Sequence, residues 1–426
     1  MLAAERVGAV TASRTARPLG LRLLNGAGAG LRRLGLPLFP LDADSLVAKA
    51  CRRTGLDDFG DDTFRDPLRR LCASFEQEAH LTPLGRLIER GECGRLLANR
   101  LRMVDVCKHN PEIAADPVER PLFILGLPRT GTSILHELLA QDPANRVPMT
   151  WEVMHPFPPP EQATFETDAR IDQVERRLAR TDQLLPDFKS IHPMGARLPQ
   201  ECVAITQHEF ASMVWHTAYR VPSYQAWLEQ ADHRWVYASH RRWLQYLQWK
   251  VTARQWVLKS PGHLWALDAL LAVYPDARIV QTHRDPLKVI ASLVSLVCTL
   301  RSIATDDIDP HEIGRDWTVR LADGLNRTMR VRDSGRVAAE QVFDVAFGEF
   351  MRDEIAMVRR MYRHFGMALS AEAEARMRRF LADNRADKHG RHTYALSLGG
   401  LDEATERRRY AQYQERYGIP SEPVSS

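Results

Sequence analysis

A short apolar run that leads into a glycine-bracketed loop is the first place where this sequence predicts chemistry. Leu122–Leu125 form the run, and the loop reads Gly126-Leu-Pro-Arg-Thr-Gly-Thr-Ser133. A glycine loop that opens a helix aims free backbone N–H groups and the positive end of the helix dipole at an anion. The pattern therefore predicts a phosphate-binding loop between a strand and a helix, with Arg129 as its only cation.

This loop departs from the nucleoside-triphosphate P-loop at one position. Thr132 follows the second glycine, Gly131, where that motif carries a lysine for the β- and γ-phosphates. The substitution argues against ATP or GTP as the reacting ligand and favours a different anion. A P-loop kinase or NTPase stays an alternative, although it needs that lysine and an aspartate after an apolar strand, and the sequence shows neither.

Two more polar loops follow apolar runs further along the chain. Gln255–Leu258 precedes Lys259-Ser-Pro-Gly-His263, and Ala277–Thr282 precedes His283-Arg-Asp-Pro286, which opens a helix over Leu287–Arg301. Strands that alternate with helices predict a parallel α/β sheet covered on both faces. Ligands of such sheets bind beyond the carboxyl ends of the strands, so we expect all three loops at one edge.

Composition sets the broad class of the protein. The chain has 426 residues, of which 44% are hydrophobic and 26% are charged, with a net charge of +4. These values are typical of a soluble globular protein, and the charge is too low for a nucleic-acid partner. Six scattered cysteines without close pairs favour free thiols, and we therefore expect a cytoplasmic protein. No run of about 18 apolar residues predicts a membrane span.

Residues 1–112 are predicted to form a helical N-terminal region without chemistry. Asp42–Ser45 is a helix-cap signal, and helical patterns cover Phe64–Glu78 and Leu84–Val106. The first residues are basic and nearly free of acids. We interpret them as a frayed or helical leader, with a transit peptide or a helix on a membrane surface as the alternatives.

Taken together, the loops resemble a known family. Residues 126–133, Leu258–His263 and the pattern Arg284-Asp-Pro-x5-Ser292 resemble sulfotransferases that use 3′-phosphoadenosine-5′-phosphosulfate (PAPS), in the bacterial branch with arginine in the first loop. Thr150-Trp-Glu152 and Lys388–Tyr394 are also similar to that branch. The resemblance covers roughly residues 113–418 and implies a P-loop-like parallel α/β fold.

The resemblance also implies a domain plan. The sulfotransferase α/β domain would cover residues 113–426. Within it, residues 160–254 would form a helical acceptor region rich in aromatic side chains, and residues 385–418 a basic C-terminal lid. All nine tryptophans lie between Trp151 and Trp317. Aromatic and apolar linings suit a lipid or aromatic acceptor, although large aromatics at helical spacing also pack in ordinary cores.

Several residues acquire donor-binding roles from the resemblance. The first loop would wrap the 5′-phosphate, and Arg129 would neutralise the bridging oxygen as charge builds on the leaving group. Arg284 and Ser292 match the family's 3′-phosphate pair. The loop residues with this implied role are Thr130, Gly131, Thr132 and Ser133. The implied lid residues are Lys388, Arg391 and His392, which read equally well as a solvated charge run. The donor requires no metal.

Sulfuryl transfer also requires a base for the acceptor proton and a cation near the sulfur. We favour Glu152 as the base, with His263 as the alternative. A buried carboxylate that caps a helix is a second interpretation of Glu152. Lys259 would stabilise the sulfuryl or bridging oxygens, or it is a strand-edge residue that reaches solvent.

The function predicted from the sequence is therefore a PAPS-dependent sulfotransferase. It would move a sulfuryl group from PAPS to a hydroxyl or amine of a small-molecule acceptor and release adenosine 3′,5′-bisphosphate (PAP). A lipophilic acceptor is one candidate class. A non-catalytic nucleotide-binding protein remains a third interpretation. Residue patterns give neither the acceptor nor the oligomeric state.

Overall fold

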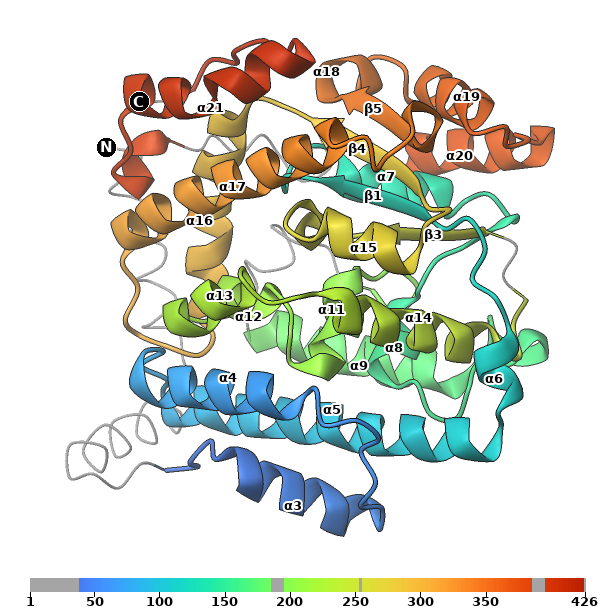
Figure 1. The fold of residues 1–426 in the computed structure, drawn as a ribbon, viewed down its shortest axis with the longest axis vertical. Coiled ribbons are helices and arrows are strands. Elements are labelled where there is room, and N and C mark those ends of the chain that lie inside the picture. Colours follow the sequence, from blue (N-terminus) through green and yellow to red (C-terminus); the bar gives the residue numbers. More distant parts are fainter. Residues whose placement is uncertain (1–37, 185–194, 253–254, 385–394, 425–426) are drawn as a thin grey trace.

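A five-stranded parallel sheet forms the centre of the upper part of the molecule (Figure 1). The structure is a computed structural model, and it describes residues 38–184, 195–252, 255–384 and 395–424. The strand order is β2-β3-β1-β4-β5. The strands are β1 (Leu122–Gly126), β2 (Asn145–Arg146), β3 (Gln255–Lys259), β4 (Arg278–His283) and β5 (Val342–Ala346).

The three strands expected from apolar runs are confirmed, and the first of them is central. Ile124 of β1 lies level with Lys259 of β3 on one side and with Val280 of β4 on the other. Every residue of β1 is buried. Because the strands are parallel, the loops that follow β1, β3 and β4 all leave from the same edge.

Side chains of β1 alternate between two cores, as the two-residue period of a strand requires. Phe123 and Leu125 join the core made with helices α14, α15, α16 and α17. Leu122 and Ile124 join the core made with α7, α19 and α20 on the other face. The predicted sheet with helices on both faces is thus confirmed.

The helices of these two layers include the predicted helix after the third polar loop. That helix, α16, spans Pro286–Arg301, with Asp285 as its N-cap. The other helices that cover the sheet are α7 (Thr132–Leu139), α14 (Arg234–Gln248), α15 (Leu267–Val273), α17 (Pro310–Asp333), α19 (Glu354–His364) and α20 (Ala371–Asp383).

The expected helical N-terminal region packs as a separate layer at the bottom of Figure 1. It contains α3 (Ala43–Thr54), α4 (Arg65–Gln77) and α5 (Pro83–His109). Asp42 caps α3 by accepting a hydrogen bond from the Ser45 amide at 2.8 Å. This layer shares a core with α12 (Val214–Ala218) and α13 (Pro222–Leu228). The basic leader lies outside the described residues.

Further helices lie between and around these layers. The remaining α-helices are α6 (Glu112–Ala115), α8 (Thr150–Met154), α9 (Ala169–Leu184), α11 (Cys202–Thr206), α18 (Phe347–Phe350) and α21 (Glu403–Tyr417). Short 3-10 helices cover Gln162–Thr164, Gln207–Glu209, Pro261–Leu264, Ala339–Gln341 and Leu396–Gly399. Within the described ranges, no helix combines the length and apolarity needed to cross a bilayer.

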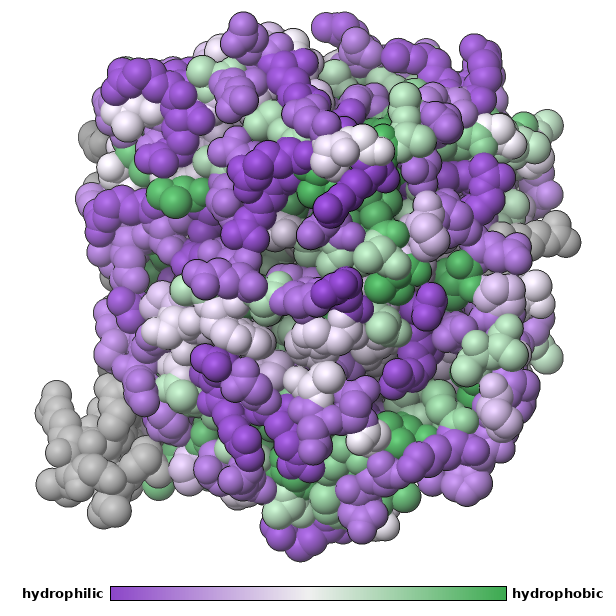
Figure 2. Space-filling view, viewed as in Figure 1, coloured by the Kyte–Doolittle hydropathy of each residue, from purple (hydrophilic) through white to green (hydrophobic). Residues whose placement is uncertain are grey.

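Most of the large aromatic side chains serve as core. Trp151, Trp215 and Trp317 are each 1% exposed, as is Tyr224. These four side chains belong to the packed core, and Trp215 also lines a cavity described below. The face shown in Figure 2 is mostly hydrophilic, with small separate hydrophobic areas. On that face, a lipophilic ligand would find no broad apolar surface to cover.

Candidate active site

The first polar loop adopts a conformation that depends on its two glycines. Gly126 has φ +153°, and a Cβ there would lie 2.2 Å from Oγ1 of Thr282. Gly131 has φ +87° and is the N-cap of α7; its Cβ would lie 3.2 Å from the ring of Phe347. The two glycines therefore let the loop pack closely against Thr282 and Phe347, and Gly131 leads the chain directly into the N-terminus of α7.

Arg129 lies at the tip of this loop in a strained, left-handed conformation with φ +65°. Its side chain is exposed, and its guanidinium makes no hydrogen bond or ion pair within the described residues. A non-glycine residue in this conformation is uncommon and often marks a functional loop. The charge is thus available to an incoming anion.

The hydroxyl of Thr130, unlike the side chain of Arg129, faces the protein interior. It is completely buried, donates to the carbonyl oxygen of Leu127 at 2.6 Å and lies 2.6 Å from Oγ1 of Thr282. It therefore holds the loop against β4. Thr132 is also buried, whereas Ser133 is exposed at the first turn of α7. Of the three hydroxyls, that of Ser133 is the most accessible to a ligand.

Lys259 connects the first loop to a carboxylate that the sequence analysis did not single out. It is the last residue of β3 and is 4% exposed. Its Nζ donates to Oγ of Ser133 at 3.1 Å and forms a close ion pair with Glu201. The predicted lysine thus lies directly beside the first polar loop, with its charge balanced by Glu201.

Arg284 meets the same loop from the end of β4. Its Nη1 donates to the carbonyl oxygen of Arg129 at 3.1 Å. Its Nε and Nη2 pair with Glu422 at 2.8 and 2.9 Å, and its guanidinium lies 4.1 Å from the ring centroid of Phe347. The two arginines predicted to hold separate phosphates are therefore neighbours, and the C-terminal Glu422 occupies the edge of Arg284.

Ser292 lies two helical turns into α16 and is 6% exposed. Its hydroxyl makes no hydrogen bond within the described part of the chain. The three basic residues of the predicted lid, Lys388, Arg391 and His392, lie outside the described residues.

Glu152, the favoured base, has both carboxylate oxygens occupied. It is fully buried, and Arg146 donates to its two oxygens at 2.8 and 2.5 Å. The amide of Met149 also donates to Oε1 at 2.8 Å, which places Glu152 in a capping box of α8. This geometry matches the helix-cap interpretation, and a catalytic role for Glu152 stays a prediction.

His263, the alternative base, is also enclosed. It is 2% exposed, and its Nδ1 lies 2.7 Å from the hydroxyl of Tyr237. Burial holds the pKa of His263 well below its usual value, and the nearby His240 and Lys259 lower it further. A small pocket of about 50 Å³ reaches it from the side of Ser260.

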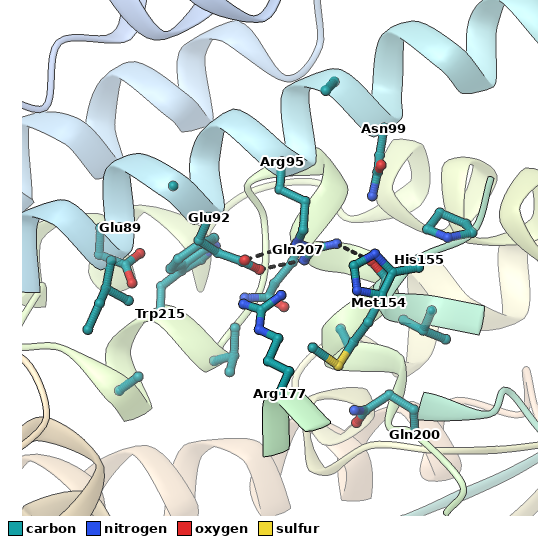
Figure 3. Close-up of a pocket in the computed structure, with 18 of the residues that line it drawn as sticks. Glu89, Glu92, Arg95, Asn99, Met154, His155, Arg177, Gln200, Gln207 and Trp215 are labelled. Carbon is teal, nitrogen blue, oxygen red and sulfur yellow. Dashed lines mark hydrogen bonds and ion pairs between the residues drawn. The ribbon is translucent and has the colours of Figure 1, made fainter. Parts of the chain in front are cut away.

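A larger cavity, of about 730 Å³, opens beside α5 (Figure 3). Glu89, Glu92, Arg95 and Asn99 project into it from α5, and Arg177 projects from α9. Other lining residues come from the end of α8, from α11 and the segment before it, and from α12; they include Met154, Gln200, Ala204, Val214 and Trp215.

The two carboxylates of this cavity have partners within its lining. Burial raises the pKa of Glu92, but the guanidinium of Arg95, which donates at 2.5 Å, outweighs this and leaves the pKa lowered. Burial raises the pKa of Glu89 to about 8, against the opposing hydrogen bond from the Tyr219 hydroxyl. The cavity therefore combines apolar walls with an internal polar cluster, a common design for binding small molecules.

One short segment links the lining of the cavity to Lys259 and so to the first polar loop. Gln200 lines the cavity, and the next residue, Glu201, pairs with Lys259. The N-terminal region was expected to carry no chemistry, yet α5 forms one wall. Sequence periodicity could not indicate this, because the cavity-facing residues of α5 are mixed in type. Elsewhere in the described residues, no cluster of three His, Cys, Asp or Glu side chains forms a metal site.

Comparisons with known proteins agree with this arrangement. Residues 121–371, more than half of the chain, match the model of the sulfotransferase family. The chain is 26% identical over 321 residues to omega-hydroxy-beta-dihydromenaquinone-9 sulfotransferase Stf3 of Mycobacterium bovis, covering 72% of this chain and 76% of that protein.

Two solved structures are similar over nearly the whole described fold. Sulfotransferase STF1 from Mycobacterium tuberculosis H37Rv superposes with a TM-score of 0.79 at 33% identity, covering 88% of this chain and 100% of that one. Sulfotransferase STF9 from Mycobacterium avium gives a TM-score of 0.81 at 32% identity, covering 89% and 97%. With the loops, strand order and family match in agreement, the chain belongs to the sulfotransferase family and is a sulfotransferase enzyme.

Proposed function

We propose that this enzyme moves a sulfuryl group from PAPS to a hydroxyl or amine of a lipophilic acceptor and releases PAP. The observation that carries the proposal is the 3.1 Å hydrogen bond from Arg284 to the backbone of Arg129. It joins the loop expected at the 5′-phosphosulfate to the residue expected at the 3′-phosphate. One adenosine donor bears both groups, so neighbouring anion sites suit it.

The residues present fit this co-substrate. Gly131 turns the loop into α7 with φ +87°, and the guanidinium of Arg129 has no partner within the described residues. We assign the 5′-phosphate to the loop amides with Ser133 and Thr132, and the 3′-phosphate to Arg284 and Ser292. Thr130 would act by holding the loop against β4. The lid residues Lys388, Arg391 and His392 stay predictions.

Lys259 is the cation proposed to face the reacting sulfur. It lies beside Ser133 at the loop, and it is almost fully buried. A preorganised ammonium in a site with little water stabilises the charge that develops on the leaving phosphate. Arg129 would share this role from the other side of the loop.

We assign the acceptor to the cavity beside α5. Its volume of about 730 Å³ lies within the usual range for small-molecule sites. The similar protein Stf3 is named for omega-hydroxy-beta-dihydromenaquinone-9, a lipophilic molecule that carries a hydroxyl group. A lipid or aromatic acceptor is consistent with the walls formed by Met154, Val214 and Trp215. Peripheral membrane contact through the basic leader stays a prediction.

Calorimetry followed by a transfer assay tests the proposal. We expect PAP to bind in the absence of metal and ATP with Mg²⁺ to bind at least tenfold more weakly (about 1.4 kcal/mol). We expect radiolabelled sulfate to pass from PAPS to components of a lipid extract. Tighter binding of ATP with Mg²⁺ than of PAP would contradict the donor assignment. Transfer only to water-soluble fractions would contradict the acceptor class.

A further inference from the structure

Glu201 is the only acidic side chain that the described structure places in an ion pair with Lys259. It is the N-cap residue of α11, and its side chain is 18% exposed. The same Lys259 Nζ donates to Ser133 at 3.1 Å. One ammonium group therefore separates the Glu201 carboxylate from the loop proposed to hold the phosphosulfate.

The backbone fixes Glu201 at the boundary of the acceptor cavity. The preceding residue, Gln200, lines that cavity. The Gln200 amide donates to the carbonyl oxygen of Pro148 at 2.7 Å, and the Glu201 amide donates to Oε1 of Gln200 at 2.8 Å. These contacts fix the backbone of the segment that lines the cavity at Gln200 and meets Lys259 at Glu201. A proton acceptor for the reaction is needed at this boundary.

Other candidates are less well placed. Arg146 and a backbone amide occupy the oxygens of Glu152. His263 is enclosed on the far side of α11, against Tyr237. Glu137 lies one turn after Ser133 on α7, and burial raises its pKa while Lys259 opposes the rise. No contact joins Glu137 to the segment that borders the cavity among the described residues.

We propose that Glu201 is the general base that accepts the acceptor's proton, an inference that rests on the proposed function. The acceptor O–H bond breaks, its proton passes to the Glu201 carboxylate, and the oxygen forms a bond to sulfur. The bond between sulfur and the bridging oxygen breaks, and its electron pair stays with the phosphate of PAP. Lys259 passes from Glu201 to that bridging oxygen as the charge develops. The products are a sulfate ester, PAP and protonated Glu201.

The test measures kcat for sulfuryl transfer from PAPS to two phenols. It compares the Glu201→Gln variant with the wild-type enzyme. Phenol must lose a proton, whereas 4-nitrophenol is mostly ionised at about pH 8 and needs no base. We expect kcat with phenol to fall about 10²- to 10⁴-fold, and kcat with 4-nitrophenol to fall far less. The acid-side decline of kcat with phenol should also disappear. Equal losses with both phenols, or no loss with either, would overturn the proposal.

Controls separate this inference from folding and from the proposed function. PAP affinity by calorimetry should be unchanged in Glu201→Gln, and Glu201→Asp should recover part of the activity with phenol. Glu137→Gln should keep wild-type rates; a base-specific loss in Glu137→Gln would transfer the role to that residue and overturn the proposal. If the wild-type enzyme binds no PAP and transfers no sulfate to phenols or lipid extract, the proposed function itself fails.

Discussion

The donor edge of the sheet and the acceptor cavity are built in opposite ways. The donor edge consists of short contiguous motifs at the ends of β1, β3 and β4, and backbone geometry positions them. The cavity gathers single side chains from α5, α8, α9, α11 and α12. A contiguous motif can be recognised in a sequence, whereas a cavity assembled from distant segments cannot.

Their electrostatics differ as well. At the donor edge, Arg129 is unpaired among the described residues, and Arg284 is held by a partly exposed carboxylate. In the cavity, Glu92 is satisfied by Arg95, and Glu89 by Tyr219. The first region is ready to exchange its partners for an anion. The second holds its two carboxylates in contacts within its own lining, to which Arg53, Arg102 and Arg177 also belong.

The largest expected effect belongs to the donor edge. Lys259→Met should lower kcat by about 10²- to 10³-fold, because it removes a preorganised cation from the leaving group. PAP affinity should change little. Lys250→Met, which removes a surface lysine paired with Glu161, is the matched control and should keep full activity. If kcat of Lys259→Met stays within twofold of the wild-type value, Lys259 does not stabilise the leaving group.

Substitutions of the two partners of the Arg284–Glu422 ion pair should change PAP affinity in opposite directions. Arg284→Ala should weaken PAP binding by about 10- to 100-fold, since a charged hydrogen bond is worth roughly 1.5–3 kcal/mol. Glu422→Gln should tighten PAP binding by at most about fivefold, because the carboxylate that occupies Arg284 is partly exposed.

Calorimetry measures both affinities. Glu403→Gln alters another carboxylate that pairs with the nearby Arg407, and it should leave PAP affinity unchanged. Weaker PAP binding by Glu422→Gln would mean that Glu422 supports the donor site rather than competing with the 3′-phosphate.

A substitution in the cavity should separate the two regions kinetically. Ala204→Phe places a ring in the cavity from α11 and should raise the acceptor KM by about tenfold, a steric loss near 1.4 kcal/mol. PAP affinity should stay at the wild-type value. Steady-state kinetics with the lipid-extract acceptor or phenol provides the measurement. An unchanged KM would place the acceptor elsewhere.

The last prediction concerns stability and pH and leaves the rate of transfer aside. The pKa of Glu89 is raised from 4.5 to about 8 in the folded protein. The folded state therefore binds a proton that the unfolded state releases between these values, and this contribution to stability is lost as the pH rises through that window. The free energy of unfolding of Glu89→Gln should equal that of the wild type near pH 5. Near pH 9 it should exceed the wild-type value by roughly a few kcal/mol at most.

Urea unfolding at the two pH values checks this prediction. Glu92→Gln is the contrasting variant: the pKa of Glu92 is lowered, so its loss should destabilise the protein at neutral pH by leaving Arg95 without its carboxylate. A Glu89→Gln variant that is less stable than wild type at pH 9 would contradict the raised pKa.

Sequence reasoning succeeded where local pattern and tertiary environment coincide. The apolar runs at β1, β3 and β4 are buried on both faces of the sheet, and they form strands as predicted. The strand β5 was not predicted, because its Asp344 interrupts the apolar pattern; that carboxylate instead pairs with Arg332 and His283.

Side-chain direction was harder to predict. Thr130 belongs to the predicted loop, but its hydroxyl turns inward to Thr282. Glu152 follows the first helix as expected, but Arg146 encloses it. Both outcomes depend on partners far from the motif or on burial that sequence spacing does not encode.

The sequence by itself determined the parallel sheet, the glycine-bracketed loop after β1 and the family, because glycine conformation and apolar periodicity act over a few neighbouring residues. Only the tertiary structure brought Arg284 to Arg129, Glu201 to Lys259 and α5 to the cavity wall. These contacts join segments separated by tens to hundreds of residues, and their geometry follows from how the helical layers pack on the sheet.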